Sequence, residues 1–307
     1  MKKYVYGIDV GGTAIKFGLF DFKGNLIRSW QIPTNIKDCG RHIIGDIREQ
    51  IYTDMQENLM SAEEVEGVGL GIPGPVKGDG NVLRAVNLGW GKCNIKEEMQ
   101  NLIQMRTEAC NDANAAALGE NWRGAGMGYE DVIMVTLGTG VGGGIIKGGK
   151  IVYGNAGYGG EIGHIHVQDG ETQRCGCGNY GCLEQYASAT GMVRIASKIK
   201  SEKSIADVSD ITCEKIFADA AAGERYALSA LEIWGGYLGK GLSIMVNMLD
   251  PECIVLGGGV SKAGNKVIEL LHPAFEEYVL KDLADIEIKL AELGNNAGIY
   301  GAAKLLI

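Results

Sequence analysis

A glycine-turn meander that occurs twice constrains this chain more than any other feature. Residues 4–32 read as strand, glycine turn, strand, Lys-Gly turn and strand, and residues 131–152 repeat that order. Short apolar runs bounded by glycine are typical of strands joined by tight turns. Two copies of one supersecondary pattern in a single chain predict a duplicated fold with a sheet in each half.

Strands and helices alternate through the rest of the chain. Between residues 41 and 60 an apolar residue recurs every fourth position, which is typical of an amphipathic helix: Ile43, Ile47, Ile51, Met55 and Leu59. The same reasoning predicts helices over residues 95–105, 113–123, 187–200, 213–221, 225–249, 262–280 and 297–306, and strands over 66–72, 106–110, 253–256 and 286–290. This alternation predicts an α/β protein with two lobes.

Composition and charge exclude several classes of protein. Of the 307 residues, 46% are hydrophobic and 22% are charged, which is ordinary for a soluble globular chain. A net charge of −9 makes the chain a poor general binder of nucleic acid or of anionic membranes, so we expect neither partner. The first residues lack the apolar core of a signal peptide, so we expect a cytoplasmic protein whose eight cysteines are thiols or metal ligands.

Three glycine loops are candidate phosphate-binding sites. They contain, in chain order, Asp9, Gly11, Gly12 and Thr13, then Gly138, Thr139 and Gly140, and finally Gly258. Glycines allow backbone N–H groups to approach an anion closely, and an acidic residue beside phosphates can hold Mg²⁺ through water. The alternative is that the glycines serve turns that need a positive φ. Three such loops in one chain favour phosphate binding.

One segment has the composition of a metal site. His164, Cys175, Cys177 and Cys182 together offer three thiolates and one imidazole. This donor set closes a tetrahedral zinc site and leaves no position for water, so the zinc would be structural. A loop of free thiols is the alternative, and His166 is a second candidate for the histidine ligand.

Carboxylates accompany these segments. Asn111 and Asp112 fall between a predicted strand end and a helix start, where they could cap the helix or supply a general base. Glu161 and Glu184 lie on either side of the metal segment, where they could hydrogen-bond a polyhydroxylated ligand or lie in solvent.

Taken together, these motifs resemble those of the ROK family of bacterial sugar kinases and sugar-responsive repressors, most of all its glucokinase branch. The motifs occur in family order along nearly the whole chain: DVGGT (9–13), LGIPGPV (70–76), NDANAAALGE (111–120), LGTGVGGG (137–144), EIGH (161–164), CGCGNYGCLE (175–184), LGGGV (256–260) and NNAGIYGAA (295–303). One departure is that many relatives place lysine directly after the GGT, whereas this chain has Ala14 and then Lys16.

The resemblance implies a two-lobed, actin-like and hexokinase-like fold, a duplicated ribonuclease-H-like architecture with a zinc knuckle and with sugar and ATP held between the lobes. Because the C-terminal helix is implied to pack on the N-terminal lobe, we expect a smaller lobe of residues 1–112 with 295–307 and a larger lobe of residues 113–294.

The resemblance also assigns roles to residues. Asp112 would be the catalytic base, and structural zinc would be bound by His164, Cys175, Cys177 and Cys182. The sugar would contact Gly74, Asn87, Asn111, Asp112, Glu161, His164 and Glu184. Nucleotide with Mg²⁺ would contact Asp9, Gly11, Gly12, Thr13, Gly138, Thr139, Gly140 and Gly258.

The function that follows is ATP-dependent phosphorylation of a hexose, with glucose giving glucose 6-phosphate. Kinases of N-acetylmannosamine, N-acetylglucosamine or another hexose are the alternative. A sugar-responsive transcriptional regulator lacking its DNA-binding domain fits less well, because a sensor needs no base at Asp112. We expect a homodimer.

Overall fold

A computed structural model describes residues 2–202 and 210–307 of the chain. The strands are β1 (Tyr4–Val10), β2 (Ala14–Asp21), β3 (Leu26–Pro33), β4 (Val65–Ile72), β5 (Asn81–Val82), β6 (Cys93–Asn94), β7 (Arg106–Asn111), β8 (Val132–Leu137), β9 (Val141–Lys147), β10 (Lys150–Ile151), β11 (Cys253–Gly257) and β12 (Glu287–Leu290). The α-helices are α1 (Lys37–Gly40), α2 (Ile43–Glu57), α3 (Ile95–Ile103), α4 (Asp112–Arg123), α5 (Glu184–Ala187), α6 (Ala189–Glu202), α7 (Cys213–Ala221), α8 (Arg225–Leu249), α9 (Asn265–Tyr278) and α10 (Ala297–Lys304).

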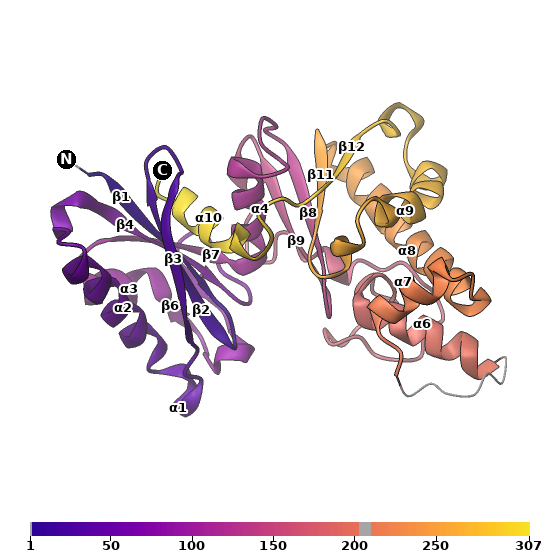
Figure 1. Cartoon of the computed structure of the whole chain (residues 1–307), viewed down its shortest axis with the longest axis horizontal. Coiled ribbons are helices and arrows are strands. Elements are labelled where there is room, and N and C mark those ends of the chain that lie inside the picture. Colours follow the sequence, from indigo (N-terminus) through magenta and orange to yellow (C-terminus); the bar gives the residue numbers. More distant parts are fainter. Residues whose placement is uncertain (1, 203–209) are drawn as a thin grey trace. The chain divides into compact units, whose positions relative to one another are not determined.

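Two five-stranded sheets share one strand order (Figure 1). The first runs β3-β2-β1-β4-β7 and the second β10-β9-β8-β11-β12. In the first, β1 pairs antiparallel with β2 and parallel with β4, and β4 pairs parallel with β7. In the second, β9 and β10 are antiparallel, and β11 pairs parallel with β8 and with β12. The predicted α/β class with a sheet in each half is confirmed.

Contacts group the chain into two compact units. One comprises residues 1–130, 144–160 and 292–307, and the other residues 131–143 and 161–291. These bounds differ from the predicted lobes of 1–112 with 295–307 and of 113–294, because α4 and the end of β9 belong with the first unit. The physical reason for α4 is its contact with α10, described next. The lobe boundaries themselves stay a prediction.

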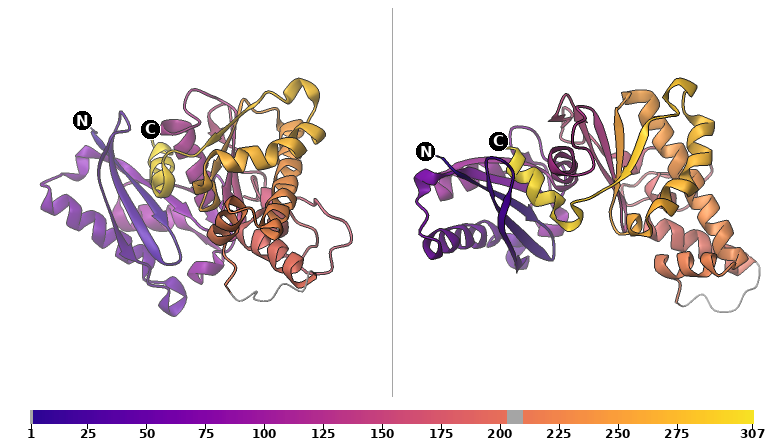
Figure 2. Two further views of the ribbon diagram at one scale, coloured as in Figure 1. Left: turned by 45° about the vertical axis from the view of Figure 1, so that its right-hand side comes forward. Right: turned by 45° about the horizontal axis from the view of Figure 1, so that its top comes forward.

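Helix α10 lies directly against backbone in the first unit, and all three views of Figures 1 and 2 show it beside the first sheet. A Cβ added to Gly301 of α10 would fall 1.6 Å from the carbonyl oxygen of Ala115 in α4, and one added to Gly119 of α4 would fall 2.2 Å from that of Ala297. Only glycine permits two backbones to approach this closely. Much of the chain's glycine content therefore serves packing rather than turns.

The other face of the first sheet carries the amphipathic helices. Ile43, Ile47, Ile51 and Met55 of α2 are buried in one apolar cluster with β1 and α3, as the spacing predicted. Leu59 was expected to continue this face, and that expectation is wrong. The helix ends at Glu57, and Leu59 has a positive φ of 52° and is 93% exposed.

The second unit packs its helices around Trp234. This side chain of α8 is fully buried, and its indole N–H donates to the carbonyl oxygen of Ala187 at 2.9 Å. Helix α9 lies against α8 at Gly235 and Gly239, where a Cβ would fall within 2.3 Å of backbone. Among residues 2–202 and 210–307, no helix combines the length and the apolar composition needed to cross a membrane.

Replacing Gly301 with alanine is expected to lower the free energy of unfolding by more than about 2 kcal/mol, because the new methyl group has no space between two backbones. The matched control is Gly45→Ala in α2, where a Cβ meets nothing within 4 Å. That change should raise the free energy of unfolding by roughly 0.5–1 kcal/mol through helix propensity. Urea unfolding of both variants measures the difference, and equal effects would contradict the packing argument.

Candidate active site

Two carboxylates emerge at one edge of the first sheet. Asp9 is near the end of β1, and Asp112 follows β7 directly as the first residue of α4. Strands β1 and β7 both run parallel to β4, which lies between them, so their carboxyl ends share an edge. Ligands of open α/β sheets bind at such edges.

Burial raises the pKa of both carboxylates above the ordinary value for aspartate. Burial raises the pKa of Asp112 to about 6, and the negative charge of Asp9 adds to the increase. Burial likewise raises the pKa of Asp9, against the opposing effect of the Lys16 ammonium 3.4 Å away. A carboxylate with a pKa near 6 is ionised at neutral pH and holds a proton more readily than an exposed one, which suits a general base.

Asn111 caps helix α4 and also orients its neighbour. Its Oδ1 accepts the N–H of Asn114 at 3.1 Å, which is the predicted capping bond. Its Nδ2 donates to Asp112 Oδ1 at 2.9 Å and to the carbonyl oxygen of Gly74 at 3.0 Å. The N–H of Ala113 donates to the same Oδ1. Both hydrogen bonds to the Asp112 carboxylate, from Asn111 and from Ala113, end on Oδ1. In the part of the chain that the structure describes, Oδ2 is therefore the oxygen available to accept a proton.

The other predicted sugar residues of the first unit lie close to these groups or to a glycine loop. Gly74 has a φ of +95°, and a Cβ there would fall 2.4 Å from the carbonyl oxygen of Arg84, so glycine is required. Asn87 is exposed on a single 3-10 turn, Val86–Leu88. A Cβ on Gly12 would lie 3.5 Å from the Cβ of Asn87. The structure therefore brings Gly74 to Asn111 and Asn87 to the first glycine loop.

Glycine is not required by backbone conformation in most of the candidate phosphate loops. None of Gly11, Gly12, Gly138 and Gly140 has a positive φ, so these glycines do not serve turns that need one. Gly258 does have a positive φ, of +87°. A Cβ on Gly138 would meet nothing within 4 Å. Neither packing nor backbone conformation explains glycine at this position, and the space in front of the backbone is open.

Two of these loops adjoin in the second unit. Strands β8 and β11 are parallel neighbours, and a Cβ on Gly258 would fall 2.4 Å from the carbonyl oxygen of Leu137. Thr139 is exposed, and its carbonyl oxygen accepts the hydroxyl of Thr190 at 2.6 Å. The loops that follow β8 and β11 therefore leave the same sheet edge.

The four predicted metal ligands converge. One ligand atom from each of His164, Cys175, Cys177 and Cys182 lies within 4.8 Å of the others. Cys177 Sγ is 3.6 Å from Cys182 Sγ, close to the ~3.8 Å between two thiolates on a tetrahedral zinc with Zn–S bonds of about 2.3 Å. These residues can hold a metal ion of this coordination.

The histidine assignment follows from the ring contacts. His164 directs Nδ1 toward Cys175 Sγ at 3.7 Å, and its Nε2 lies 3.8 Å from a carboxylate oxygen of Glu161. A ligating histidine commonly has a carboxylate at its other ring nitrogen. His166 has both ring nitrogens engaged, with Tyr180 O and Asp169 Oδ1, each at 2.9 Å. His166 is therefore excluded as the ligand.

Glu184 links the metal cluster to a glycine loop. Its Oε2 accepts the N–H of Val141 at 3.1 Å, and its Oε1 lies 3.7 Å from Cys175 Sγ. A Cβ on Gly140 would fall 2.2 Å from Oε2, so this glycine makes room for the carboxylate. Both alternatives considered for Glu184, a free surface group and a ligand contact, omitted this structural bond.

Sequence reasoning missed one contact of the first carboxylate pair. A Cβ on Gly298 of α10 would fall 2.7 Å from Cγ of Asp9, so α10 forms part of the surroundings of Asp9. The signal was a glycine inside the short C-terminal helical pattern, because glycine weakens a helix and can mark a close approach of another group. Each unit thus gathers its own predicted residues, and the roles assigned to them stay predictions.

Comparisons with known proteins give one consistent family. The model described as ROK family matches residues 5–307. A glucokinase of Halalkalibacterium halodurans is 39% identical over 313 residues, covering 99% of this chain and 95% of its own. An N-acetyl-D-glucosamine kinase of Yersinia pseudotuberculosis is 34% identical and covers 98% of both chains. The crystal structure of a ROK family glucokinase from Streptomyces griseus with glucose and AMPPNP superposes with a TM-score of 0.77 at 33% identity, covering 98% of each chain.

Asp112→Asn is expected to stabilise the protein at neutral pH but not in acid. The folded pKa of about 6 exceeds the ordinary value of about 3.9, so the folded protein holds this proton more tightly than the unfolded chain. The wild-type free energy of unfolding should therefore fall by roughly 2–3 kcal/mol as pH rises from about 4 to about 6. Urea unfolding at pH 4 and pH 7.5 tests this, and the same stability difference at both pH values would contradict it.

Proposed function

Because this chain belongs to the ROK family, we propose that it is an ATP-dependent hexose kinase whose preferred acceptor is glucose. The observation that carries the proposal is Asp112, a carboxylate with a pKa of about 6 at the carboxyl edge of a parallel sheet, held through one oxygen by Asn111. The glucokinases among the relatives support glucose as the acceptor.

In the proposed reaction, Asp112 accepts the proton of the sugar 6-hydroxyl. The sugar oxygen forms a bond to the γ-phosphorus of ATP, the bond from that phosphorus to the β,γ-bridging oxygen breaks, and ADP leaves. Phosphoryl transfer needs little covalent help from a protein, so alignment and charge balance supply most of the catalysis. Oδ2 of Asp112 accepts the proton while the bonds from Asn111 and Ala113 keep the carboxylate oriented.

Glycine loops would bind the nucleotide in this proposal. A Cβ on Gly12 would only touch Asn87, and one on Gly138 would meet nothing within 4 Å, so a phosphate could approach the backbone of both loops closely. Asp9 would hold Mg²⁺ through water, and the ion would neutralise phosphate charge. Lys16 stands beside Asp9, so this chain has an ammonium near the loop although Ala14 occupies the position where many relatives have lysine.

An N-acetylhexosamine is the second acceptor that the comparisons favour, because a relative named N-acetyl-D-glucosamine kinase matches over nearly the whole chain. The two acceptors differ at the sugar 2-position. Glu161, His164 and Glu184 in the second unit and Gly74, Asn87 and Asn111 in the first are the residues we assign to sugar binding.

We further propose that the metal cluster holds structural zinc within a duplicated, hexokinase-like fold. Three thiolates and an imidazole suit zinc, and they leave no coordination position for a reacting water. Bound zinc would supply rigidity to the segment that presents Glu161 and His164. Glu184 contacts Cys175, so the same segment would also fix that carboxylate.

Asp112→Asn is expected to bind hexose within about tenfold of wild type but to lose turnover by several orders of magnitude, because the amide cannot accept the proton. Calorimetry gives hexose affinity and an assay of sugar phosphate formation gives turnover. Turnover close to that of wild type would remove Asp112 as the base.

Cys177→Ser is expected to lower the zinc content and the hexose affinity together, since one of four donors is weakened. The matched control is Cys39→Ser, which changes another exposed cysteine, in the first unit. Metal analysis and calorimetry measure both quantities. A metal-free wild type with normal hexose affinity would contradict the role given to zinc.

A further inference from the structure

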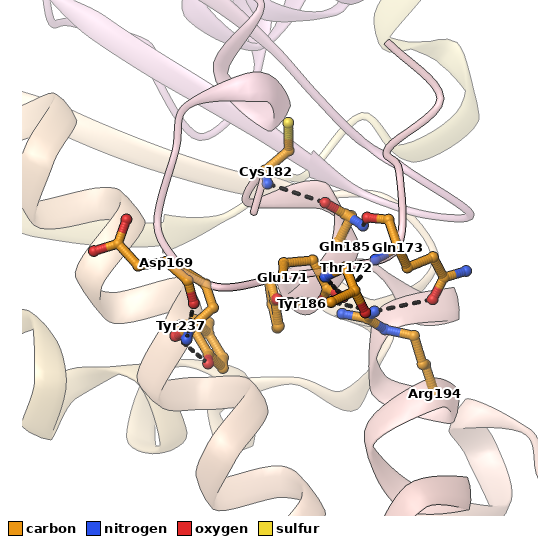
Figure 3. Close-up of polar contacts among 10 residues, drawn as sticks. Asp169, Glu171, Thr172, Gln173, Cys182, Gln185, Tyr186, Arg194 and Tyr237 are labelled. Carbon is orange, nitrogen blue, oxygen red and sulfur yellow. Dashed lines mark hydrogen bonds and ion pairs between the residues drawn. The ribbon is translucent and has the colours of Figure 1, made fainter. Parts of the chain in front are cut away.

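Glu171 lies in the loop between His164 and Cys175 of the metal cluster, and its carboxylate accepts four hydrogen bonds. Its Oε1 accepts the backbone N–H groups of Thr172 and Gln173, each at 3.0 Å. Its Oε2 accepts the hydroxyl of Tyr186 and Nη1 of Arg194, the latter at 2.9 Å. Figure 3 shows these side chains directed toward one another from the loop, α5 and α6. One carboxylate therefore joins three segments.

Arg194 reinforces this junction from α6. Its Nη1 also donates to Oε1 of Gln173 at 3.1 Å, and its guanidinium lies 4.8 Å from the centre of the Tyr186 ring. The hydroxyl of Tyr186, the backbone N–H of Gln173 and the charge of Arg194 lower the pKa of Glu171 to about 2. Glu171 is therefore ionised at every pH at which the protein would work.

A second set of bonds continues from the junction to the metal cluster. The carbonyl oxygen of Gln173 accepts Nε2 of Gln185 at 2.9 Å, and Oε1 of Gln185 accepts the N–H of Cys182 at 3.1 Å (Figure 3). Cys182 is one of the four predicted metal ligands. The loop, α5 and the cluster are thus tied together through side chains.

These bonds hold the beginning of helix α5, whose last residue, Ala187, is bonded to Trp234. The helix comprises four residues, Glu184–Ala187, and a single helical turn has almost no stability of its own. Its second and third residues, Gln185 and Tyr186, both bind the loop. Its first residue is Glu184, so the direction of that carboxylate follows from where the next two side chains are held.

We propose that Glu171, acting with Tyr186 and Arg194, is a positioning residue for hexose recognition. It holds α5 so that Glu184 meets both the metal cluster and the N–H of Val141. This inference rests on the proposed function, because Glu184 is assigned to sugar binding there. Glu171 itself touches no proposed substrate residue, so its effect is exerted through α5.

Glu171→Gln is the main test, with hexose affinity, Mg·ATP affinity, turnover and metal content measured on the same preparation. We expect the hexose Kd and KM to rise about tenfold, as loss of a charged hydrogen-bond acceptor would allow. Metal content should be unchanged, while kcat and the KM for Mg·ATP should stay within about threefold. The matched control is Glu269→Gln, which breaks the exposed 2.9 Å pair with Lys266 on α9 and should change none of these.

Tyr186→Phe is the milder second variant, since it keeps the buried ring and removes only the hydroxyl bond to Glu171. It should raise the hexose Kd in the same direction and add little in the Glu171→Gln background. Unchanged hexose affinity in both variants overturns the inference. A similar loss of affinity for hexose and Mg·ATP, or loss of the metal, also overturns it, because either shows general damage. If the wild-type protein binds no hexose, the proposed function itself is wrong. If the wild type is active and both variants have its hexose affinity, only the inference about Glu171 is wrong.

Discussion

The contact between α4 and α10 is the constraint on which the first unit depends. Gly119 and Gly301 let the two helix backbones touch, and the same helix α10 places Gly298 against Asp9. Helix α4 begins at Asp112, so the packing that fixes the two helices also fixes the two carboxylates near one another. Burial raises the pKa of both carboxylates, and the charge of Asp9 raises that of Asp112 further. The same helix packing therefore stabilises the first unit and positions its two carboxylates. It holds them in a buried setting where their ionisation is unfavourable.

In the second unit, side-chain hydrogen bonds and the four predicted metal ligands, rather than close contact of helix backbones, hold the candidate site residues in place. Its polar segment between residues 161 and 184 has little regular structure, and the bonds of Glu171, Gln185 and Glu184 take the place of a sheet or a long helix. A metal ion bound by His164 and three cysteines would add to this rigidity. In the function that we propose, residues of this segment bind a sugar, and such residues must be held closely in place.

Much of this could be predicted from local sequence. The repeated meander predicted a sheet in each half, and four-residue spacing predicted α2, because both are short-range patterns. The four metal ligands were found by their chemistry and do converge. The resemblance implied that the C-terminal helix packs on the N-terminal lobe, but the individual contacts could not be predicted. Nothing local to Gly301 says that Ala115 lies against it, and nothing local to Leu59 signals its positive φ. The bond from Glu184 to Val141 joins residues 43 apart, beyond any local pattern.

The most direct measurement is ADP formation from Mg·ATP by the zinc-replete protein, with glucose, with other hexoses and N-acetylhexosamines in turn, and with no sugar. The account predicts sugar-dependent ADP formation, with the highest kcat/KM for glucose. A higher value for N-acetylglucosamine would leave the kinase intact and replace its acceptor. No ADP above the sugar-free rate with any of these sugars would contradict the account.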